Sequence, residues 1–267
     1  MLKMNNITKT FNSGTVDERV ALDHLTLTLH DGDFVTVIGG NGAGKSTMQN
    51  AICGTWRPDE GSIELDGVNV SAMPEYKRAR YLGRVYQDPM MGTSAGMQIE
   101  ENLALAERRG RRHTLRPGIR RSEREDYRRR LRELGLGLED RLTTKVGTLS
   151  GGQRQALTLL MATLQRPKLL LLDEHTAALD PGTAEKVLEL TKKIVAENHI
   201  TCLMITHNMH DALTLGNRTL MMDHGRIVLD VADEERAHMT VDGLLQRFAE
   251  NVGHALDNDR ILLSAEG

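Results

Sequence analysis

The sequence has few aromatic residues, few cysteines and no long apolar run, and each shortage excludes a class of protein. Phe, Trp and Tyr make up 3% of the 267 residues, so aliphatic residues and 13 Met must fill any core. Cys53 and Cys202 lack the spacing of a metal site or a disulfide framework, which favours a reducing compartment. The apolar run at 169–172 is far too short to cross a bilayer, and residues 1–6 lack the apolar core of a signal peptide. Any role at a membrane is therefore expected to come through a partner.

Positive and negative charges nearly cancel over the whole chain, but they are unevenly distributed along the sequence. The formal net charge is −3 and 27% of residues are charged, which is typical of a soluble globular protein and does not predict nucleic-acid binding. Residues 107–132, however, carry twelve Arg against four acids, a local charge of +8. The remainder of the chain therefore carries about −11.

Strand patterns alternate with helical patterns, which predicts an α/β fold with a parallel sheet covered by helices. Leu25, Leu27 and Leu29 alternate with threonines, as in a half-buried strand. Nearly continuous apolar segments predict strands buried on both faces at 34–38, 169–172 and 201–206. A further short strand is expected at 62–65, and helices are expected at 46–52 and 183–198.

The middle of the chain has a different pattern. From residue 98 to about 166 no strand is evident and helix-forming residues dominate. We interpret 90–165 as a helical subdomain inserted into an α/β core. The core then comprises 1–89 and 166–245, with 246–267 as a tail of the same single domain. After the turn at 223–227 we expect only short helices.

A glycine-rich loop directly follows the predicted strand at 34–38. Residues 39–46 place glycines at the first and sixth positions before Lys-Ser, the phosphate-loop pattern. Gly42 and Gly44 let backbone N–H groups approach phosphate oxygens, Lys45 supplies a positive charge, and Ser46 offers a hydroxyl to Mg²⁺. Such a pattern arises by chance in roughly 1% of chains of this length, and its place after a buried strand lowers that figure. The loop therefore predicts a triphosphate site.

Chemically active side chains follow two other predicted strands. Asp173 and Glu174 end the strand at 169–172, at the edge where open α/β sheets bind ligands. We expect Asp173 to hold Mg²⁺ through water and Glu174 to activate the attacking water; acids that merely cap the next helix are the alternative. His207 follows the strand at 201–206 and is expected beside the γ-phosphate, with an ordinary surface or core histidine as the alternative.

A second anion site is predicted at the start of a helix. Ser150 is a natural N-cap, and Gly151 and Gly152 leave the helix N-terminus open to an anion. Taken alone, the segment is an ordinary capped helix start. A phosphate contact follows only if the γ-phosphate bound by one subunit meets this helix in another subunit.

The ordered set of motifs resembles the ATP-binding cassette (ABC) ATPases over essentially the whole chain. The resemblance implies a P-loop NTPase (RecA-like) fold and a head-to-tail dimer in which the signature, 149–153, of one copy closes over ATP on the Walker A loop, 39–47, of the other. It implies catalytic roles for Glu174, His207, Gln87 and Lys45 and magnesium binding by Ser46, Gln87 and Asp173. The implied nucleotide contacts are Phe11, Gly39, Asn41, Gly42, Ala43, Gly44, Lys45, Ser46, Thr47, Ser150, Gly151, Gly152, Gln153 and Asp180.

Four positions have particular roles or substitutions within this resemblance. Phe11 stands where the family stacks an aromatic ring on adenine, although Tyr is commoner there and a core Phe is the alternative. The resemblance implies that Gln87 reports nucleotide occupancy to the helical subdomain and that Asp180 couples the two sites. His175 replaces the usual Pro. It is a tolerated loop substitution, or it alters the loop, or it lies near the site and titrates around neutral pH.

The resemblance implies an ATPase subunit of a membrane transporter, peripheral at the cytoplasmic face and bound to permease subunits. A single cassette without a membrane segment resembles importer components, with an amino acid as the solute and a solute-binding protein compatible with the complex. The alternatives are an exporter ATPase, a soluble ABC ATPase acting on ribosomes or DNA, a P-loop kinase and an inactive binding subunit. No nucleic-acid partner is expected. The segment 107–132 is either a solvated helix with a flexible start at 110–118 or a contact with anionic lipid or the permease.

Overall fold

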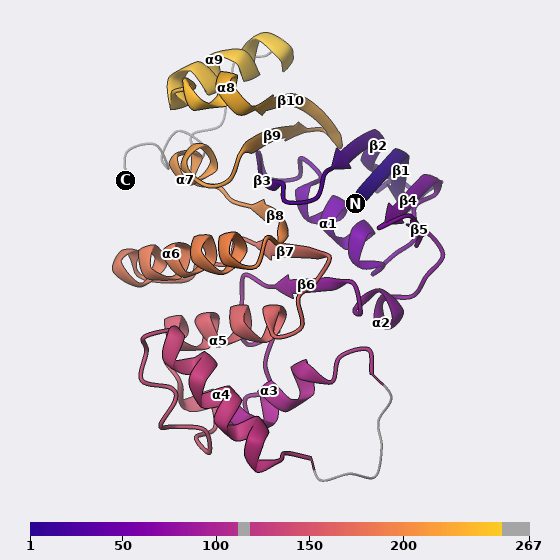
Figure 1. Cartoon of the computed structure of the whole chain (residues 1–267). Coiled ribbons are helices and arrows are strands. Elements are labelled where there is room, and N and C mark those ends of the chain that lie inside the picture. Colours follow the sequence, from indigo (N-terminus) through magenta and orange to yellow (C-terminus); the bar gives the residue numbers. More distant parts are fainter. Residues whose placement is uncertain (112–117, 253–267) are drawn as a thin grey trace. The chain divides into compact units, whose positions relative to one another are not determined.

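The computed structural model describes residues 1–111 and 118–252 (Figure 1). The chain divides into two compact units, Met1–Arg78 with Ile200–Gly267, and Ala79–His199. The predicted division into a core at 1–89 and 166–245, an insert at 90–165 and a tail at 246–267 stays a prediction. No helix among the described residues is both long and apolar enough to span a membrane.

The first unit contains an antiparallel sheet in the order β2-β1-β4-β5. Its strands are β1 (Leu2–Phe11), β2 (Arg19–Leu29), β4 (Glu60–Leu65) and β5 (Val68–Asn69). In β2 the side chains of Leu25, Leu27 and Leu29 are buried, which confirms the predicted alternation. The strand predicted at 62–65 forms the last four residues of β4. The long β1 was not predicted, because its mixture of polar and apolar residues has no strict period.

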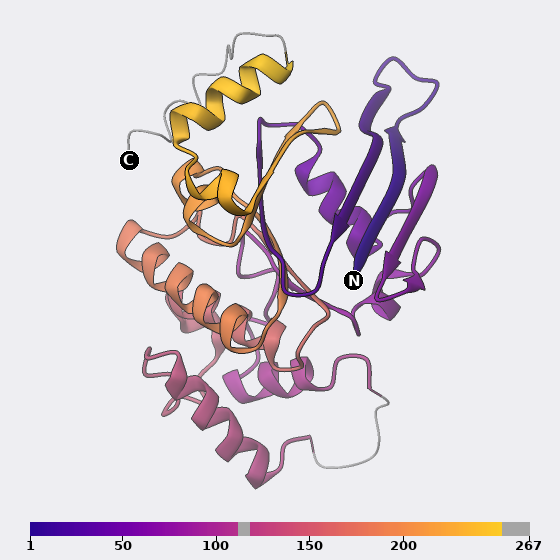
Figure 2. The same ribbon diagram turned by 45° about the horizontal axis from the view of Figure 1, so that its top comes forward.

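The first unit also contains strands in the order β10-β9-β3-β8. Every residue of β3 is buried, and β3 pairs in parallel with both β8 and β9, as its continuous apolar sequence predicted. Helix α1 packs against β2 and β3, as the turned view in Figure 2 also shows. These elements are β3 (Phe34–Gly39), α1 (Lys45–Cys53), α2 (Glu75–Arg78), β8 (Thr201–Ile205), α7 (Met209–Thr214), β9 (Arg218–Asp223), β10 (Arg226–Ala232), α8 (Asp233–Ala237) and α9 (Val241–Val252).

The prediction of only short helices after the turn at 223–227 was wrong in part. Strand β10 follows the turn and pairs antiparallel with β9, so the core is a mixed sheet. Most of β10 is half-exposed, and an edge strand of this kind needs few apolar residues. Its sequence therefore lacks the apolar pattern by which the other strands were predicted. Helices α8 and α9 then follow, and Leu244 and Phe248 of α9 pack with Ile38 and Met221.

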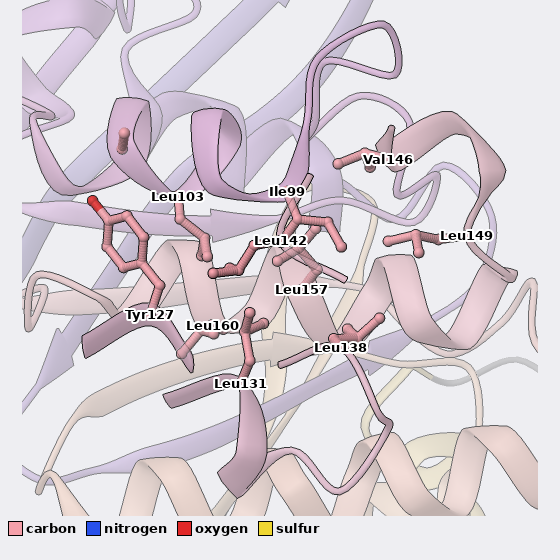
Figure 3. Close-up of a cluster of buried hydrophobic side chains, with 11 residues drawn as sticks. Ile99, Leu103, Tyr127, Leu131, Leu138, Leu142, Val146, Leu149, Leu157 and Leu160 are labelled. Carbon is pink, nitrogen blue, oxygen red and sulfur yellow. The ribbon is translucent and has the colours of Figure 1, made fainter. Parts of the chain in front are cut away.

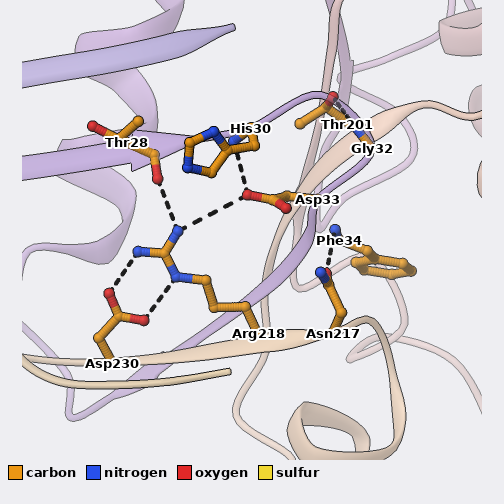
Figure 4. A network of polar contacts seen from close by, with 9 residues as sticks. All are labelled: Thr28, His30, Gly32, Asp33, Phe34, Thr201, Asn217, Arg218 and Asp230. Atoms are coloured by element: carbon orange, nitrogen blue, oxygen red, sulfur yellow. Dashed lines mark hydrogen bonds and ion pairs between the residues drawn. The ribbon is translucent and has the colours of Figure 1, made fainter. Parts of the chain in front are cut away.

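An ion-pair network fixes the amino-terminal end of β3, opposite the end that leads into the glycine loop (Figure 4). Arg218 on β9 forms two bonds to Asp230 on β10, with Nε–Oδ1 at 2.7 Å and Nη2–Oδ2 at 2.5 Å. Its Nη1 donates to the Thr28 carbonyl at 2.8 Å and lies 3.9 Å from Asp33 Oδ2. Such a bidentate arginine–carboxylate pair fixes the relative orientation of the two side chains in addition to stabilising their contact. The network therefore joins β2 to β9 and β10 and has a structural role.

The second unit pairs β6 (Leu82–Val85) in parallel with β7 (Leu169–Asp173). Its helices are α3 (Ile99–Glu107), α4 (Arg121–Glu133), α5 (Gly151–Thr163) and α6 (Pro181–Glu197), with a 3₁₀ turn at Val146–Thr148. Between 98 and 166 the described residues form no strand and only an isolated bridge, Gln98 with Lys145, so the helical prediction for this region is confirmed.

An aliphatic cluster holds α3, α4 and α5 together (Figure 3). Ile99 and Leu103 of α3 face Leu131 of α4 and Leu157 of α5, and all four are fully buried. Burying each such side chain stabilises the fold by about 1.5–3 kcal/mol. The cluster fulfils the expectation that aliphatic residues compose the core of a chain poor in aromatics.

Several arginines of the basic segment are bound within the second unit. Arg124 donates twice to Glu100, at 2.7 and 2.8 Å, and the Glu100 side chain is only 4% exposed. Arg108 pairs with Glu123 at 2.9 Å, and Arg109 donates to the carbonyl of Ala162 at 3.2 Å. Part of the local +8 charge therefore serves internal packing. The predicted flexible start at 110–118 falls largely outside the described residues.

Candidate functional site

The glycine loop between β3 and α1 forms a compact cradle. Gly42 and Gly44 have φ of 82° and 102°, in the left-handed region that favours glycine. A Cβ added to Gly44 would lie 2.7 Å from the Ala21 carbonyl oxygen, so no side chain fits there. Lys45 is buried, and its Nζ donates to the carbonyls of Gly39 at 2.7 Å and Gly40 at 3.0 Å. The carbonyl groups of the loop therefore hold the Lys45 ammonium group in place.

Two carbonyls of this loop are bound by neighbouring elements. Arg19 Nη2 on β2 donates to the Gly42 carbonyl at 2.8 Å. The N–H of Gly225, in the β9–β10 turn, donates to the Ala43 carbonyl at 2.9 Å. A loop that binds an anion must direct its carbonyl oxygens away from that anion. These contacts fix two of the loop's carbonyls and favour a preformed site.

Arg19 was not among the predicted site residues. It is 23 residues before Gly42 in the chain, so no local motif links the two positions. The structure links them because β1 and β2 form a hairpin in which Phe11 pairs directly with Arg19. The one available signal was the strand pattern at 25–29, which did not extend to Arg19.

We expect loss of the Arg19 side chain to weaken nucleotide binding. Arg19→Met removes the donor to Gly42 and should raise the Kd for Mg-ATP about three- to tenfold, given the worth of a charged hydrogen bond at an exposed position. Isothermal titration calorimetry measures this Kd. The matched control is Arg57→Met, because Arg57 is also exposed and also donates to a carbonyl, that of Ala72. Equal Kd values for the two variants would contradict the prediction, and Arg19→Lys should restore part of the affinity.

Phe11 ends β1 with 37% of its surface exposed, so it is not a core Phe. Its ring meets the Trp56 ring edge-on, with centroids 5.9 Å apart. Lys9 Nζ lies 5.5 Å from the centre of Phe11 and 5.6 Å from that of Trp56, and it pairs with Asp59 at 2.7 Å. Trp56 thus supports Phe11 while part of the Phe11 ring stays open. An exposed ring supported in this way suits stacking on a flat heterocycle.

His207 lies at the same edge of the sheet as the glycine loop. In the β3–β8 pairing Val37 is opposite Ile205, and the chain continues two residues further to Gly39 and to His207. The N–H of Thr206 donates to the Val37 carbonyl at 3.1 Å, which maintains this register. The His207 side chain is exposed. The first unit therefore brings Lys45, Ser46 and His207 to one edge.

The second unit brings its predicted residues to one edge in the same way. Val85 of β6 pairs with Leu172 of β7, so Gln87 and Glu174 each follow two residues beyond that pair. Asp173 Oδ2 lies 3.7 Å from Arg84 Nη2. Parallel strands deliver their carboxyl ends to one edge, where ligands of α/β sheets bind. Gln87 is exposed, and Asp173 and Glu174 are half-buried.

The signature helix α5 begins as predicted, with one difference in the role of its glycines. Ser150 Oγ accepts the Gln153 N–H at 3.2 Å, which confirms the N-cap. A Cβ added to Gly152 would lie 2.0 Å from Thr183 Cγ2 on α6, whereas one on Gly151 would meet only Leu179, at 3.4 Å. Gly152 is therefore required by helix packing, and Gly151 leaves the helix start open. Ser150 and Gly151 are both exposed.

Asp180 and His175 flank the loop that follows β7. Asp180 caps α6 by accepting the Thr183 N–H at 3.1 Å, and that hydrogen bond holds the pKa of its carboxyl below the ordinary value. His175 is 1% exposed, and burial lowers its pKa to about 4. His175 is therefore neutral at physiological pH, so the alternative that it titrates near neutral pH was wrong. It is a buried residue of the loop.

The donor set suits a nucleotide with Mg²⁺. No group of three or more His, Cys, Asp or Glu side chains in 1–111 and 118–252 could hold a metal by itself. Mg²⁺ does not need such a group, because it keeps several waters and is commonly held by one or two side chains and by substrate phosphates. Each unit offers one ligand of that kind: the first has the exposed Ser46 hydroxyl at the start of α1, and the second has the half-buried Asp173 carboxylate.

A glycine cradle at a helix start, a buried lysine in the loop and acids at the end of a parallel strand together define the class of P-loop nucleotide-binding proteins. Comparison with known proteins identifies the family within this class. The model of the ABC transporter family matches residues 22–177, and the chain therefore belongs to that family. It is an ATPase that binds ATP with Mg²⁺, with the P-loop NTPase fold that its motifs predicted.

Relatives and solved structures agree with this assignment. The chain is 44% identical to a tyrosine transport ATP-binding protein of Clostridioides difficile, over 93% of this chain and 98% of the relative. It is 38% identical to the methionine import ATP-binding protein MetN of Corynebacterium diphtheriae, over 85% of this chain and 64% of the relative. Among solved structures, the ATP-binding cassette MJ0796, in a dimeric post-hydrolysis state with ADP and phosphate, matches with a TM-score of 0.74 and 28% identity, over 87% of this chain and 98% of that one.

Proposed function

We propose that this chain is the ATPase subunit of an amino-acid importer, peripheral at the cytoplasmic face of the membrane beneath permease subunits. One observation carries the proposal: the 44% identity to a tyrosine transport ATP-binding protein extends over 93% of the chain and 98% of the relative. The methionine import relatives support the same class of solute. The tyrosine transport and methionine import relatives give no support to an exporter, or to a soluble ATPase acting on ribosomes or DNA.

The first unit binds the nucleotide in this proposal. Phe11 stacks on the adenine ring, and the backbone of Gly39–Thr47 binds the phosphates with the positive end of α1. Lys45 neutralises charge on the β- and γ-phosphates, and Ser46 would be a ligand of Mg²⁺. His207 orients the γ-phosphate and the attacking water. The buried, carbonyl-bound position of Lys45 supports this assignment, because a fixed charge costs no rearrangement on binding.

The second unit supplies the residues that act on water. A carboxylate oxygen of Glu174 accepts a proton from the attacking water. Asp173 would hold Mg²⁺, and Gln87 would bind Mg²⁺ or the water. The metal supplies charge neutralisation to the phosphates. Gln155 of the signature helix donates to the Tyr86 carbonyl at 3.0 Å, next to Gln87. That contact supports Gln87 as the residue that transmits occupancy to the helical region.

A second copy of the chain completes each site. In a head-to-tail dimer, the open start of α5 in one copy, with Ser150, Gly151 and Gln153, meets the phosphates bound by the other copy. Asp180 then lies at the interface and couples the two sites. The exposure of Ser150 and Gly151 supports this arrangement, and so does the dimeric state of the cassette MJ0796.

Purification of the native complex tests this function. An affinity-tagged chain, expressed in its own host and extracted from membranes in mild detergent, should bring with it a multispanning permease, identified by mass spectrometry. In the reconstituted complex, an aromatic or sulfur-containing amino acid, presented with a solute-binding protein if one co-purifies, should stimulate ATP hydrolysis. Recovery of the chain with ribosomes or DNA, or stimulation by an unrelated solute class alone, would overturn the proposal.

A further inference from the structure

The loop between β7 and α6 starts with an unusual backbone at Glu174. Its φ is 45°, in the left-handed region that residues other than glycine rarely adopt. Such a conformation costs free energy and persists only where the surroundings impose it. Since Glu174 carries the catalytic carboxylate in the proposed function, the contacts that impose this backbone also fix where the carboxylate lies.

His175, the residue after Glu174, makes a buried hydrogen bond to α6. Its Nε2 lies 3.1 Å from Thr191 Oγ1 on α6, and both side chains are buried. The Thr191 hydroxyl already donates its hydrogen to the Val187 carbonyl, at 2.8 Å. Thr191 must therefore accept from His175, which places the histidine proton on Nε2. The geometry therefore makes His175 the donor and Thr191 the acceptor of this buried hydrogen bond.

The loop is consequently attached to α6 at both ends. At its far end Asp180 caps the helix, and at its near end His175 reaches Thr191, three turns along the same helix. Between them the Ala177 N–H donates to the Glu174 carbonyl at 3.0 Å and closes a turn. The segment 174–180 thus has a backbone turn, a helix cap and one buried side-chain bond.

We propose that the His175–Thr191 hydrogen bond is a positioning clamp that holds Glu174 in its left-handed backbone and thereby aims its carboxylate at the attacking water. The inference rests on the proposed role of Glu174 as the base. His175 itself touches no nucleotide in this proposal. Proline, the residue found here in the pattern that the sequence resembles, has no side-chain donor, so the clamp belongs to chains with a donor at this position.

The test removes the acceptor without changing the shape of the site. Thr191→Val should lower kcat about tenfold or more, since a small misplacement of a catalytic group is costly, while the Kd for Mg-ATP stays within about twofold. Thr191→Ser keeps the hydroxyl and should retain most of kcat. The matched control is Thr163→Val on α5, because Thr163 also donates to a carbonyl of its own helix, that of Leu159, at 2.8 Å. Its kcat should stay within about twofold of the original.

A double variant separates positioning through Glu174 from a general structural role. In the Glu174→Gln background, where the base is absent, Thr191→Val should cause no further loss of residual turnover. A further loss of the same size would overturn the proposal, and so would equal kcat for Thr191→Val and the original chain. A second pair of variants tests the donor of the same hydrogen bond. His175→Gln keeps a donor and should retain more kcat than His175→Leu. The reverse order of kcat would contradict the clamp.

The outcomes also distinguish the clamp from the proposed function. Undiminished turnover of Glu174→Gln alone would remove the assignment of the base and the clamp with it. Loss of turnover in Glu174→Gln, together with normal turnover in Thr191→Val, would remove the clamp alone.

Discussion

Replacement of Glu174 by Gln should abolish most ATP hydrolysis and leave ATP binding intact. A general base contributes about 10²- to 10⁴-fold to a rate, so kcat should fall within that range. The amide is nearly isosteric with the carboxylate, and Glu174 is half-buried, so the fold should persist. Phosphate release measures turnover, and equilibrium binding of Mg-ATP measures the Kd.

The matched control for this variant is Glu185→Gln. Glu185 lies on α6 in the same unit and is exposed, so its charge is solvated. Its replacement should change kcat by no more than about twofold. The Glu174→Gln variant should in addition accumulate as an ATP-bound dimer in light scattering with Mg-ATP. A variant that hydrolyses ATP at the original rate would show that another group takes the proton.

Replacement of Ser150 by Arg should abolish hydrolysis while each isolated chain still binds nucleotide. The substitution removes the N-cap of α5, which costs about 0.5–2 kcal/mol, and places a long side chain where the partner's phosphates are expected. Since Ser150 is exposed, the unit should remain folded. Steady-state phosphate release and the Kd for Mg-ATP are the two measurements.

The control for Ser150→Arg separates the lost cap from the blocked surface. Ser150→Asn keeps a good N-cap without the long side chain and should retain more hydrolysis than Ser150→Arg. Loss of ATP binding in Ser150→Arg would argue that the signature belongs to the nucleotide site of its own copy. Equal loss of hydrolysis in both variants would argue against a blocked interface.

Residues with local signals were predictable from the sequence. The glycine loop, the Ser150 cap and the apolar strand that ends at Asp173 each depend on neighbours within a few residues, so their patterns survive in a single sequence. The strands β6 and β10 were missed for the opposite reason. Each is short or lies at an edge, and pairing with a partner stabilises it more than its own composition does.

Two features of the site could not be inferred from the sequence, because they depend on contacts between residues far apart in the chain. Arg19 reaches Gly42 only because β1 and β2 form a hairpin beside the loop. The burial of His175 depends on Thr191, sixteen residues further along the chain. The exchange of Pro for His was visible, but whether that histidine is buried or exposed, and hence its pKa, follows from tertiary packing.

The dependence of ATPase activity on chain concentration tests the central claim most directly. If two copies form each site, the specific activity per chain in saturating Mg-ATP should be low in dilute solution and rise to a plateau as dimers form. The dimer population followed by light scattering should rise over the same concentrations. A chain that stays monomeric with Mg-ATP, yet hydrolyses it at a constant rate per molecule across that range, would contradict the account.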